Sequence, residues 1–371
     1  MSKRVIITGG GTGGHIFPAI SIANELKKID STIEILFVGA DGGMEMRVVP
    51  QYGYKILSVK ISGIMRSFSP KNILKNLMLP FKLIGSLMTS RSIIRDFKPD
   101  VVVGVGGYAS GPVGRAAASK GIPVVLCEQN AYPGITNKLL AQKAARILLG
   151  NEAAQQYFDK SKSKVTGNPV RETLLSGDRN KGLAAFNLDG NRPVVLSLGG
   201  SLGAGTLNAA WELGWKQLAD QGIQLVWQCG KRFHDELNAR LPKHPNLHLA
   251  AFIEDMASTY AAADLVVTRA GGSTISELIL LNKPAILIPS PNVAEDHQTK
   301  NARSLTDRGA AILVKDVEAK ETLAGVVLDI LQHPKKLKAL QAGIEAVEKH
   351  DSAHEIATEI LSLIKNNGHG S

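Results

Sequence analysis

Short runs of β-branched residues alternate with helical patterns along most of the sequence. The first run, residues 5–8 (VIIT), leads into a glycine-rich turn at 9–14, and apolar residues then recur at spacings of three and four from Ile16 to Leu26. This succession predicts a strand, a tight turn and an amphipathic helix. Because strands and helices keep alternating in this way, we predict parallel sheets with helices on their faces.

The same pattern occurs twice, which predicts two successive α/β units. Glycine-rich turns follow the first strand of each half, at 9–14 and 199–205, and a later strand of each half, at 106–112 and 271–274. We therefore expect two Rossmann-like, doubly wound parallel sheets whose strand ends face a shared cleft. Strands are predicted in the first half at 5–8, 33–39, 59–61, 99–105, 123–127 and 146–149, before a linker at about 160–169. Those of the second half are predicted at 193–198, 224–228, 247–252, 264–268 and 284–289.

The formal net charge of +10 is unevenly placed along the 371 residues. Residues 1–170 hold 22 Lys and Arg against 10 Asp and Glu, whereas residues 171–371 hold 21 against 23. No acidic residue occurs between Glu45 and Asp96. This asymmetry indicates an anionic partner for the first half of the chain. No feature favours nucleic acid as that partner.

A long helical pattern at residues 72–97 begins in this acid-free region, and Pro80 and Gly85 are expected to kink or split it. An amphipathic, basic segment of this kind is typical of an anionic membrane surface. The side chains expected to meet that surface are Leu77, Met78, Phe81, Lys71, Lys75 and Lys82. No uncharged apolar run approaches the ~20 residues that span a bilayer, and no signal peptide precedes the first strand. We expect a cytosolic protein that attaches peripherally to the membrane.

The sequence contains no pattern typical of a metal site. Cys127 and Cys229 end apolar runs and have no Cys or His partner at metal-ligand spacing, so buried, reduced thiols are expected. No candidate site loop contains an Asp-x-Asp element. We therefore expect no metal and no other cofactor.

The opening turn carries the first candidate chemistry. Gly9, Gly11 and Gly14 match the G-x-G-x-x-G spacing of phosphate-binding turns, and a helix N-terminus presents backbone N–H groups to an anion. Such turns also occur where a helix merely packs closely on a sheet. His15 lies where the anionic ligand is expected, and histidine titrates in a range that suits proton transfer near neutral pH. Its alternative roles are capping the helix and binding phosphate.

The second half offers candidates for a sugar nucleotide. Glu277 lies about one turn into a helix that follows the turn at 271–274. A carboxylate there accepts hydrogen bonds from a vicinal diol such as a ribose, although a first-turn acid also favours the helix dipole. Residues 295–301 (EDHQTKN) are rich in hydrogen-bonding groups that suit a sugar, although an ordinary solvated loop has the same composition. Asp41, after the second strand, nearly supplies the ribose acid of a dinucleotide enzyme, so an oxidoreductase is a weaker alternative.

Seven motifs, taken in order, closely resemble those of the MurG family of bacterial N-acetylglucosaminyltransferases, which convert lipid I to lipid II in peptidoglycan synthesis. They span essentially the whole chain, at residues 8–18 (TGGGTGGHIFP), 106–112, 128–130 (EQN), 167–171 (GNPVR), 199–201, 271–277 and 296–298. Cys127 stands where the family has a histidine. The resemblance implies a GT-B fold, with an acceptor- and membrane-facing domain at 1–166 and a UDP-GlcNAc-binding domain at 167–345. It also implies that a C-terminal helix within 346–371 packs back on the first domain.

The resemblance further implies an activity and a set of site residues. The activity is the inverting transfer of GlcNAc from UDP-GlcNAc to the C4 hydroxyl of MurNAc in lipid I, at the cytoplasmic face of the bacterial membrane. The implied donor residues are Thr12, Gly13, Gly14, Asn130, Arg171, Ser201, Ile253, Gly272, Ser273, Thr274, Ile275, Ser276, Glu277 and Gln298. Among these, Ile253 and Arg171 are implied for the uracil, Glu277 for the ribose and Gln298 for the sugar. The implied acceptor residues are His15, Tyr108 and Asn130, beside Thr12, Gly13 and Gly14, with His15 and Glu128 as the catalytic groups.

Three rival classes remain open at this point. Another GT-B lipid glycosyltransferase, such as a diacylglycerol galactosyltransferase, or a UDP-GlcNAc epimerase would share the fold, although an epimerase needs no lipid-facing patch. A dinucleotide-dependent oxidoreductase would bind NAD tightly. A non-catalytic glycan or membrane binder has no use for His15 in a phosphate turn.

Overall fold

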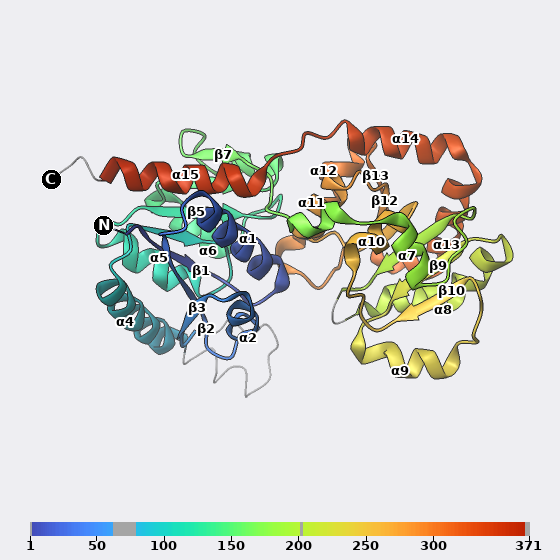
Figure 1. Ribbon diagram of the computed structural model, residues 1–371, viewed down its shortest axis with the longest axis horizontal. Coiled ribbons are helices and arrows are strands. Elements are labelled where there is room, and N and C mark those ends of the chain that lie inside the picture. The colour runs from blue at the N-terminus through green and yellow to red at the C-terminus, as the bar shows by residue number, and fades with distance from the viewer. Residues whose placement is uncertain (1, 62–78, 201–202, 368–371) are drawn as a thin grey trace. The chain divides into compact units, whose positions relative to one another are not determined.

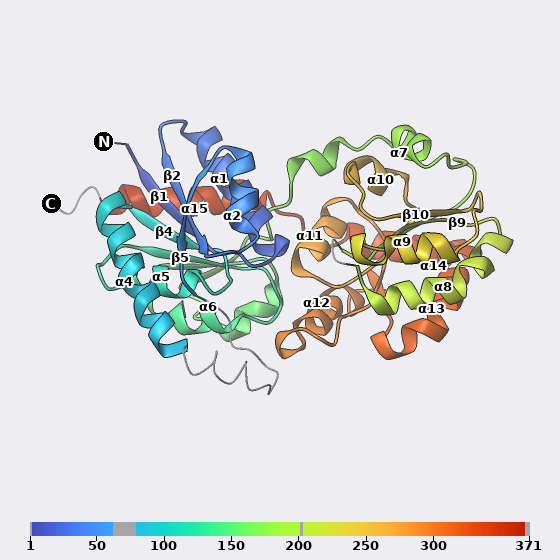
Figure 2. The same cartoon turned by 90° about the horizontal axis from the view of Figure 1, so that it is seen from below.

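The computed structural model describes residues 2–61, 79–200 and 203–367, and the chain forms two compact units. Unit 1 comprises Met1–Val170 and His350–Ser371, and unit 2 comprises Arg171–Lys349 (Figure 1). Each unit is built on one parallel sheet with helices on both faces, as Figure 2 shows from a second side. The prediction of two parallel-sheet α/β units is therefore confirmed.

The sheet of unit 1 has the strand order β3-β2-β1-β4-β5-β6-β7, with every pairing parallel. Its strands are β1 (Arg4–Thr8), β2 (Glu34–Ala40), β3 (Lys55–Val59), β4 (Val101–Gly104), β5 (Val124–Glu128), β6 (Arg146–Leu149) and β7 (Ser163–Val165). Two sequence-based expectations are wrong here. The third strand overlaps the predicted 59–61 only at Val59, and the predicted linker at 160–169 contains the seventh strand.

Successive side chains of β1 point to opposite faces of this sheet. Val5 and Ile7 pack with Ile16 and Leu26 of α1, whereas Ile6 packs with Ile94 of α4. The helices of unit 1 are α1 (Gly13–Ile29), α2 (Glu45–Val48), α4 (Leu79–Phe97), α5 (Ser110–Ala118), α6 (Ile135–Leu140) and α15 (Ser352–Asn367). Short 3-10 helices occupy Val49–Tyr52, Ala141–Lys143 and Glu152–Tyr157.

Helix α4 continues through Gly85, so the expected split at that residue is wrong. Pro80 is its second described residue. Residues 62–78, which include the first part of the predicted helical stretch, lie outside the described residues. Across the part of the chain that the structure describes, no helix is long and apolar enough to cross a membrane.

The C-terminal helix α15 belongs to unit 1 and lies beside α1 (Figure 1). Its buried residues Ile356, Ala357 and Ile360 join the same hydrophobic cluster as Val5 and Ile7. At the edge of this contact, His354 Nδ1 lies 3.0 Å from the carboxylate of Glu25, a buried residue of α1.

The sheet of unit 2 has the order β10-β9-β8-β11-β12-β13, again with parallel pairings throughout. Its strands are β8 (Val194–Leu198), β9 (Gln224–Gln228), β10 (Leu247–Ala250), β11 (Leu265–Thr268), β12 (Ala285–Leu287) and β13 (Ala311–Leu313). Its helices are α7 (Arg179–Ala185), α8 (Gly205–Asp220), α9 (Lys231–Arg240), α10 (Met256–Ala262), α11 (Gly272–Leu280), α12 (His297–Thr306), α13 (Asp316–Gln332) and α14 (Pro334–Glu345). Short 3-10 helices occupy Glu172–Ser176 and Ala294–Asp296.

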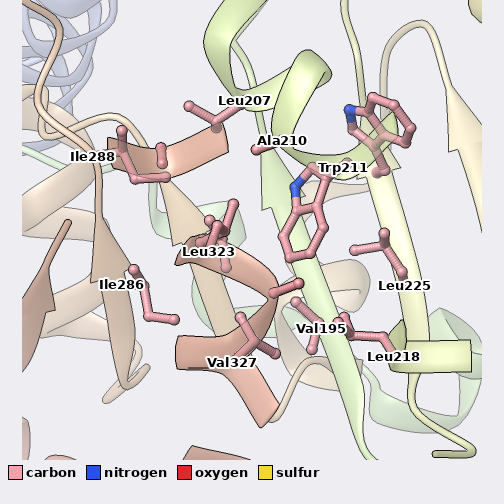
Figure 3. Close-up of a cluster of buried hydrophobic side chains, with 14 of the residues drawn as sticks. Val195, Leu207, Ala210, Trp211, Leu218, Leu225, Ile286, Ile288, Leu323 and Val327 are labelled. Atoms are coloured by element: carbon pink, nitrogen blue, oxygen red, sulfur yellow. The ribbon is translucent and has the colours of Figure 1, made fainter. Parts of the chain in front are cut away.

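Two buried tryptophans lie at the centre of unit 2. Trp211 of α8 packs with Val195, Leu323 and other members of the cluster drawn in Figure 3. Its indole N–H donates to Ser197 Oγ at 2.6 Å, and that of Trp227 donates to Asn208 Oδ1 at 2.9 Å. Both rings therefore bury their apolar surface without leaving a polar group unpaired.

Candidate functional site

In unit 1, two glycine turns meet at the carboxyl ends of neighbouring strands. Gly10, after β1, donates its N–H to the carbonyl of Gly106, after β4, at 3.3 Å. A Cβ on Gly107 would lie 2.5 Å from the carbonyl oxygen of Gly10. Gly10 and Gly107 have φ values of +149° and +83°, which side chains rarely adopt. Positions 10 and 107 must therefore both be glycine for the two backbones to approach so closely.

His15 lies in the first turn of α1, and the glycine turn fixes its ring. Its Nδ1 is 2.9 Å from the carbonyl oxygen of Gly10. A carbonyl only accepts hydrogen bonds, so Nδ1 carries the proton and the neutral ring keeps its lone pair on Nε2. That nitrogen lies against the second turn, where a Cβ on Gly106 would be 2.8 Å away. The ring is thus held in the tautomer that accepts a proton at Nε2.

Glu45, at the start of α2, was not singled out from the sequence. Its side chain is 1% exposed, and its two oxygens accept the N–H groups of Gly11 at 2.9 Å and Ala40 at 2.8 Å. A Cβ on Gly10, Gly39 or Gly43 would lie 2.2–2.4 Å from this side chain. The N–H of Gly11, which the phosphate-binding hypothesis assigned to a ligand, therefore donates to a carboxylate of the protein itself. The glycines on both sides of the acid were the available sequence signal.

Glu128, the last residue of β5, organises the loop that follows it. Its Oε1 accepts the backbone and side-chain N–H groups of Asn130 at 3.1 and 3.2 Å. Its Oε2 accepts from Gly134 N at 3.0 Å and from Asn137 Nδ2 at 2.8 Å. The side chain is 3% exposed. These contacts favour a role in positioning Asn130 over the catalytic role that the resemblance implied for Glu128.

The structure brings the unit 1 candidates together on one edge of the sheet. Thr12, Gly13, Gly14 and His15 follow β1, Tyr108 follows β4, Glu128 ends β5, and Asn130 follows it. These three strands are adjacent in the order β1-β4-β5. Tyr108 is 57% exposed at this edge. The carboxyl ends of parallel strands are where ligands bind in sheets of this kind.

In unit 2, Glu277 lies in α11, which begins directly after the turn that follows β11. Its Oε2 accepts the hydroxyl of the buried Tyr260 at 3.0 Å, and its Oε1 lies 4.0 Å from Arg171 Nη2. Burial raises the pKa of the Glu277 carboxyl above its ordinary value, opposed by the charge of Arg171 and the Tyr260 hydrogen bond. Gly272, Ser273, Thr274, Ile275 and Ser276 form the first turns of the same helix.

The remaining described candidates of unit 2 lie after β10 and in α12. Ile253 is 4% exposed, between β10 and α10. Gln298, in α12, uses Oε1 to accept the N–H of Ser290 at 2.8 Å. Asn301, one turn further along, donates to the carbonyl of Ala270 at 3.0 Å and so ties α12 to the turn before α11. Ser201 lies outside the described residues.

The described residues contain no group of three or more His, Cys, Asp or Glu side chains arranged to hold a metal ion. Cys127 and Cys229 are both buried and free, and burial raises their thiol pKa values to about 12 and about 11. These thiols stay protonated at neutral pH, so they are poor nucleophiles and poor metal ligands.

Comparison with known proteins adds to this geometry. The model of the glycosyltransferase family 28 N-terminal domain matches residues 5–149, and that of the C-terminal domain matches residues 194–356. A relative from Phocaeicola vulgatus, 47% identical over 97% of this chain and 96% of its own length, is named UDP-N-acetylglucosamine--N-acetylmuramyl-(pentapeptide) pyrophosphoryl-undecaprenol N-acetylglucosamine transferase.

Solved structures agree with these matches. The crystal structure of Acinetobacter baumannii MurG is 29% identical, with a TM-score of 0.79 over 97% of this chain and 99% of that one. A putative UDP-N-acetylglucosamine 2-epimerase from Listeria monocytogenes covers 100% of this chain and 98% of its own, with a TM-score of 0.70, but is only 16% identical. That second likeness concerns the fold alone. Both halves match one family, and a nearly full-length relative shares close to half of the residues. The chain therefore belongs to glycosyltransferase family 28.

Proposed function

We propose that this chain transfers GlcNAc from UDP-GlcNAc to the C4 hydroxyl of MurNAc in lipid I, forming lipid II for peptidoglycan synthesis. The observation that carries this proposal is the 47% identity, over 97% of the chain, to a relative named for that transfer. The arrangement of both sheet edges supports it, because each gathers the residues that the family resemblance implied. An epimerase is supported only at the level of the fold.

Unit 2 is the proposed donor site. Glu277 accepts the ribose hydroxyls, Arg171 and the backbone near Ile253 hold the uracil, and Gln298 contacts the sugar. The first turns of α11 direct backbone N–H groups toward the diphosphate, and the helix N-terminus favours its negative charge. The same groups stabilise the charge that develops on UDP as it leaves.

Unit 1 is the proposed acceptor site, with His15 as the base. The C4 hydroxyl of MurNAc gives its proton to Nε2 of His15 while its oxygen attacks C1 of GlcNAc. The new C1–O bond forms as the bond from C1 to the phosphate oxygen breaks, and UDP leaves with that electron pair. In-line attack inverts C1, so the α-linked donor yields a β-linked product. Tyr108 and Asn130 lie on the same edge and are proposed to hold the acceptor.

We also propose that the chain attaches peripherally to the cytoplasmic face of the membrane, and the exposed side chains of helix α4 support attachment to a lipid surface. Leu83, Ile84 and Met88 are 51%, 59% and 65% exposed, and Lys82 lies on the same helix. Exposed apolar side chains with basic neighbours suit an anionic lipid surface. Lys71, Lys75, Leu77 and Met78 lie outside the described residues, and the Phe81 side chain is not described either.

Product analysis tests the proposed function. The chain is incubated with UDP-GlcNAc and a lipid-linked MurNAc-pentapeptide, with NAD and with UDP-GlcNAc alone as comparisons. We expect a β-linked disaccharide lipid and one UDP released for each transfer. Conversion of UDP-GlcNAc to its C2 epimer without acceptor would contradict the proposal and support the epimerase alternative. Tight binding of NAD would instead support an oxidoreductase.

A further inference from the structure

Tyr260 is a buried phenol whose hydroxyl points to the candidate donor site. It lies in α10, is 1% exposed, and donates its hydroxyl proton to Glu277 Oε2 at 3.0 Å. No sequence motif singles out Tyr260, and the chemistry proposed above does not use it. A buried phenol gains its apolar packing from the ring alone, and Phe would pack in the same way but leave Glu277 Oε2 without this donor. The hydroxyl therefore requires an explanation of its own.

The hydroxyl restrains Glu277 at one of its two oxygens. The other oxygen, Oε1, faces Arg171 Nη2 at 4.0 Å, and the Glu277 side chain keeps 21% of its surface exposed. A carboxylate held at Oε2 is fixed in orientation, with Oε1 directed toward Arg171. A site ordered before binding does not lose side-chain entropy when the ligand arrives.

The segment that carries Tyr260 is itself firmly held. Asp255 caps α10 by accepting the N–H of Ser258 at 3.1 Å, and it also pairs with Lys181 of α7 at 2.9 Å. Ile253, proposed to meet the uracil, lies two residues before this cap. One segment, residues 253–260, thus links the proposed base contact to the group that orients the proposed ribose contact.

We propose that Tyr260 is a positioning residue for nucleotide recognition, whose hydroxyl orients the Glu277 carboxylate toward the 2′- and 3′-hydroxyls of the ribose. This role rests on the proposed assignment of the ribose to Glu277. Tyr260 touches neither the substrate nor the reacting atoms. Its effect on binding passes entirely through Glu277.

The test compares Tyr260→Phe with the wild-type chain by calorimetry, using UDP and 2′-deoxy-UDP. We expect UDP affinity to fall by about 10-fold, as when a hydrogen bond to a charged group is lost. The preference for UDP over 2′-deoxy-UDP should shrink toward unity. KM for UDP-GlcNAc should rise by a similar factor, with kcat changed less than about twofold. Tyr54→Phe is the matched control, since it removes a hydroxyl that donates to Asn24 in unit 1.

The pH dependence gives a readout that loss of packing would not move. Burial raises the pKa of Glu277, and the Tyr260 hydrogen bond opposes that rise. Without the hydroxyl, the pKa should be higher, so UDP affinity should be lost at a higher pH than in the wild-type chain as the pH falls. In the Glu277→Gln background, Tyr260→Phe should change UDP affinity less than twofold. A folded Tyr260→Phe chain with the wild-type preference between the two nucleotides would overturn the proposal. A wild-type chain that binds no UDP would refute the donor assignment instead.

A second measurement applies if the variant does not fold. The wild-type chain is labelled with 3-fluorotyrosine at its six tyrosines, of which Tyr260 is the buried one. The fluorine resonance of Tyr260 is identified as the one least affected by a soluble relaxation agent. We expect UDP to shift this resonance and 2′-deoxy-UDP to shift it less. Equal responses, or no response to UDP, would overturn the proposal.

Discussion

The Glu45 carboxylate accepts the backbone N–H of Gly11 at 2.9 Å, inside the turn that places His15. Its other oxygen accepts from Ala40 at 2.8 Å, so one buried acid joins the ends of β1 and β2. The preceding residue, Gly10, provides the carbonyl oxygen that accepts a hydrogen bond from His15 Nδ1. The turn is therefore shaped by the protein itself before any ligand binds.

Replacing Glu45 by Gln should harm both stability and turnover. The amide keeps one acceptor oxygen but directs N–H groups at a backbone N–H, which should cost about 2–4 kcal/mol in the free energy of unfolding. We expect kcat to fall about 10-fold through displacement of His15, with UDP affinity unchanged because unit 2 is untouched. Denaturant unfolding and calorimetry measure these effects. The exposed Glu34→Gln is the control, and a normal kcat in Glu45→Gln would argue against the link to His15.

Replacing His15 by Ala should lower kcat by ~10²–10⁴-fold if it is the general base. Donor affinity should change little, because His15 lies in unit 1. Steady-state kinetics with a lipid-linked acceptor measure both quantities. Turnover close to that of the wild-type chain would remove the base assignment and direct attention to Asp41.

Glu277→Ala should weaken UDP and UDP-GlcNAc binding alike, by ~1.5–3 kcal/mol, the worth of hydrogen bonds to a charged group. Since burial raises the pKa of this carboxyl, wild-type UDP affinity should fall as the pH drops through that raised value. The variant should lose this part of the pH dependence. Calorimetry across pH decides the matter, and unchanged UDP affinity in a folded variant would exclude Glu277 from the site.

The contact between α1 and α15 should be sensitive to acid. Burial acts to raise the pKa of Glu25, but hydrogen bonds from His354 and Lys28 outweigh it and leave that pKa below its ordinary value. A depressed carboxyl pKa stabilises the fold above the unfolded-state value and loses that contribution as pH falls. We expect the melting temperature to drop below about pH 4.5, and less so in Glu25→Gln. The same acid response in both chains would refute the assignment.

Membrane binding should depend on the exposed face of α4. Ile84→Glu combined with Met88→Glu should reduce binding to anionic vesicles by at least about 10-fold. Lys82→Glu should weaken it by about 1 kcal/mol, an effect that salt removes. Leu213→Glu, an equally exposed apolar position in unit 2, is the control. Vesicle sedimentation at two salt concentrations is the measurement, and binding that survives the double change would place the contact elsewhere.

The strong apolar runs were sufficient to predict most strands, because strands buried on both faces are nearly continuous in Val, Ile and Leu. Strands β7 (Ser163–Val165) and β13 (Ala311–Leu313) were missed since each has three residues and lies at a sheet edge, where pairing depends on a neighbour distant in sequence. The same limit applies to the site. The glycines beside Glu45 are consistent with its burial but do not identify its hydrogen-bond partners. Nothing near Tyr260 in the sequence shows that it is buried against Glu277.

The placement of α15 affects the order in which the chain is completed during synthesis. Unit 1 takes residues from both ends of the chain, with the whole of unit 2 inserted between Val170 and His350. Ile356, Ala357 and Ile360 complete the hydrophobic cluster that the first strand begins. During translation, all residues of unit 2 are synthesised before α15, so the hydrophobic cluster of unit 1 is still incomplete at that stage. Translation stalled near residue 349 would therefore leave unit 2 with its full sequence attached to a unit 1 that lacks α15.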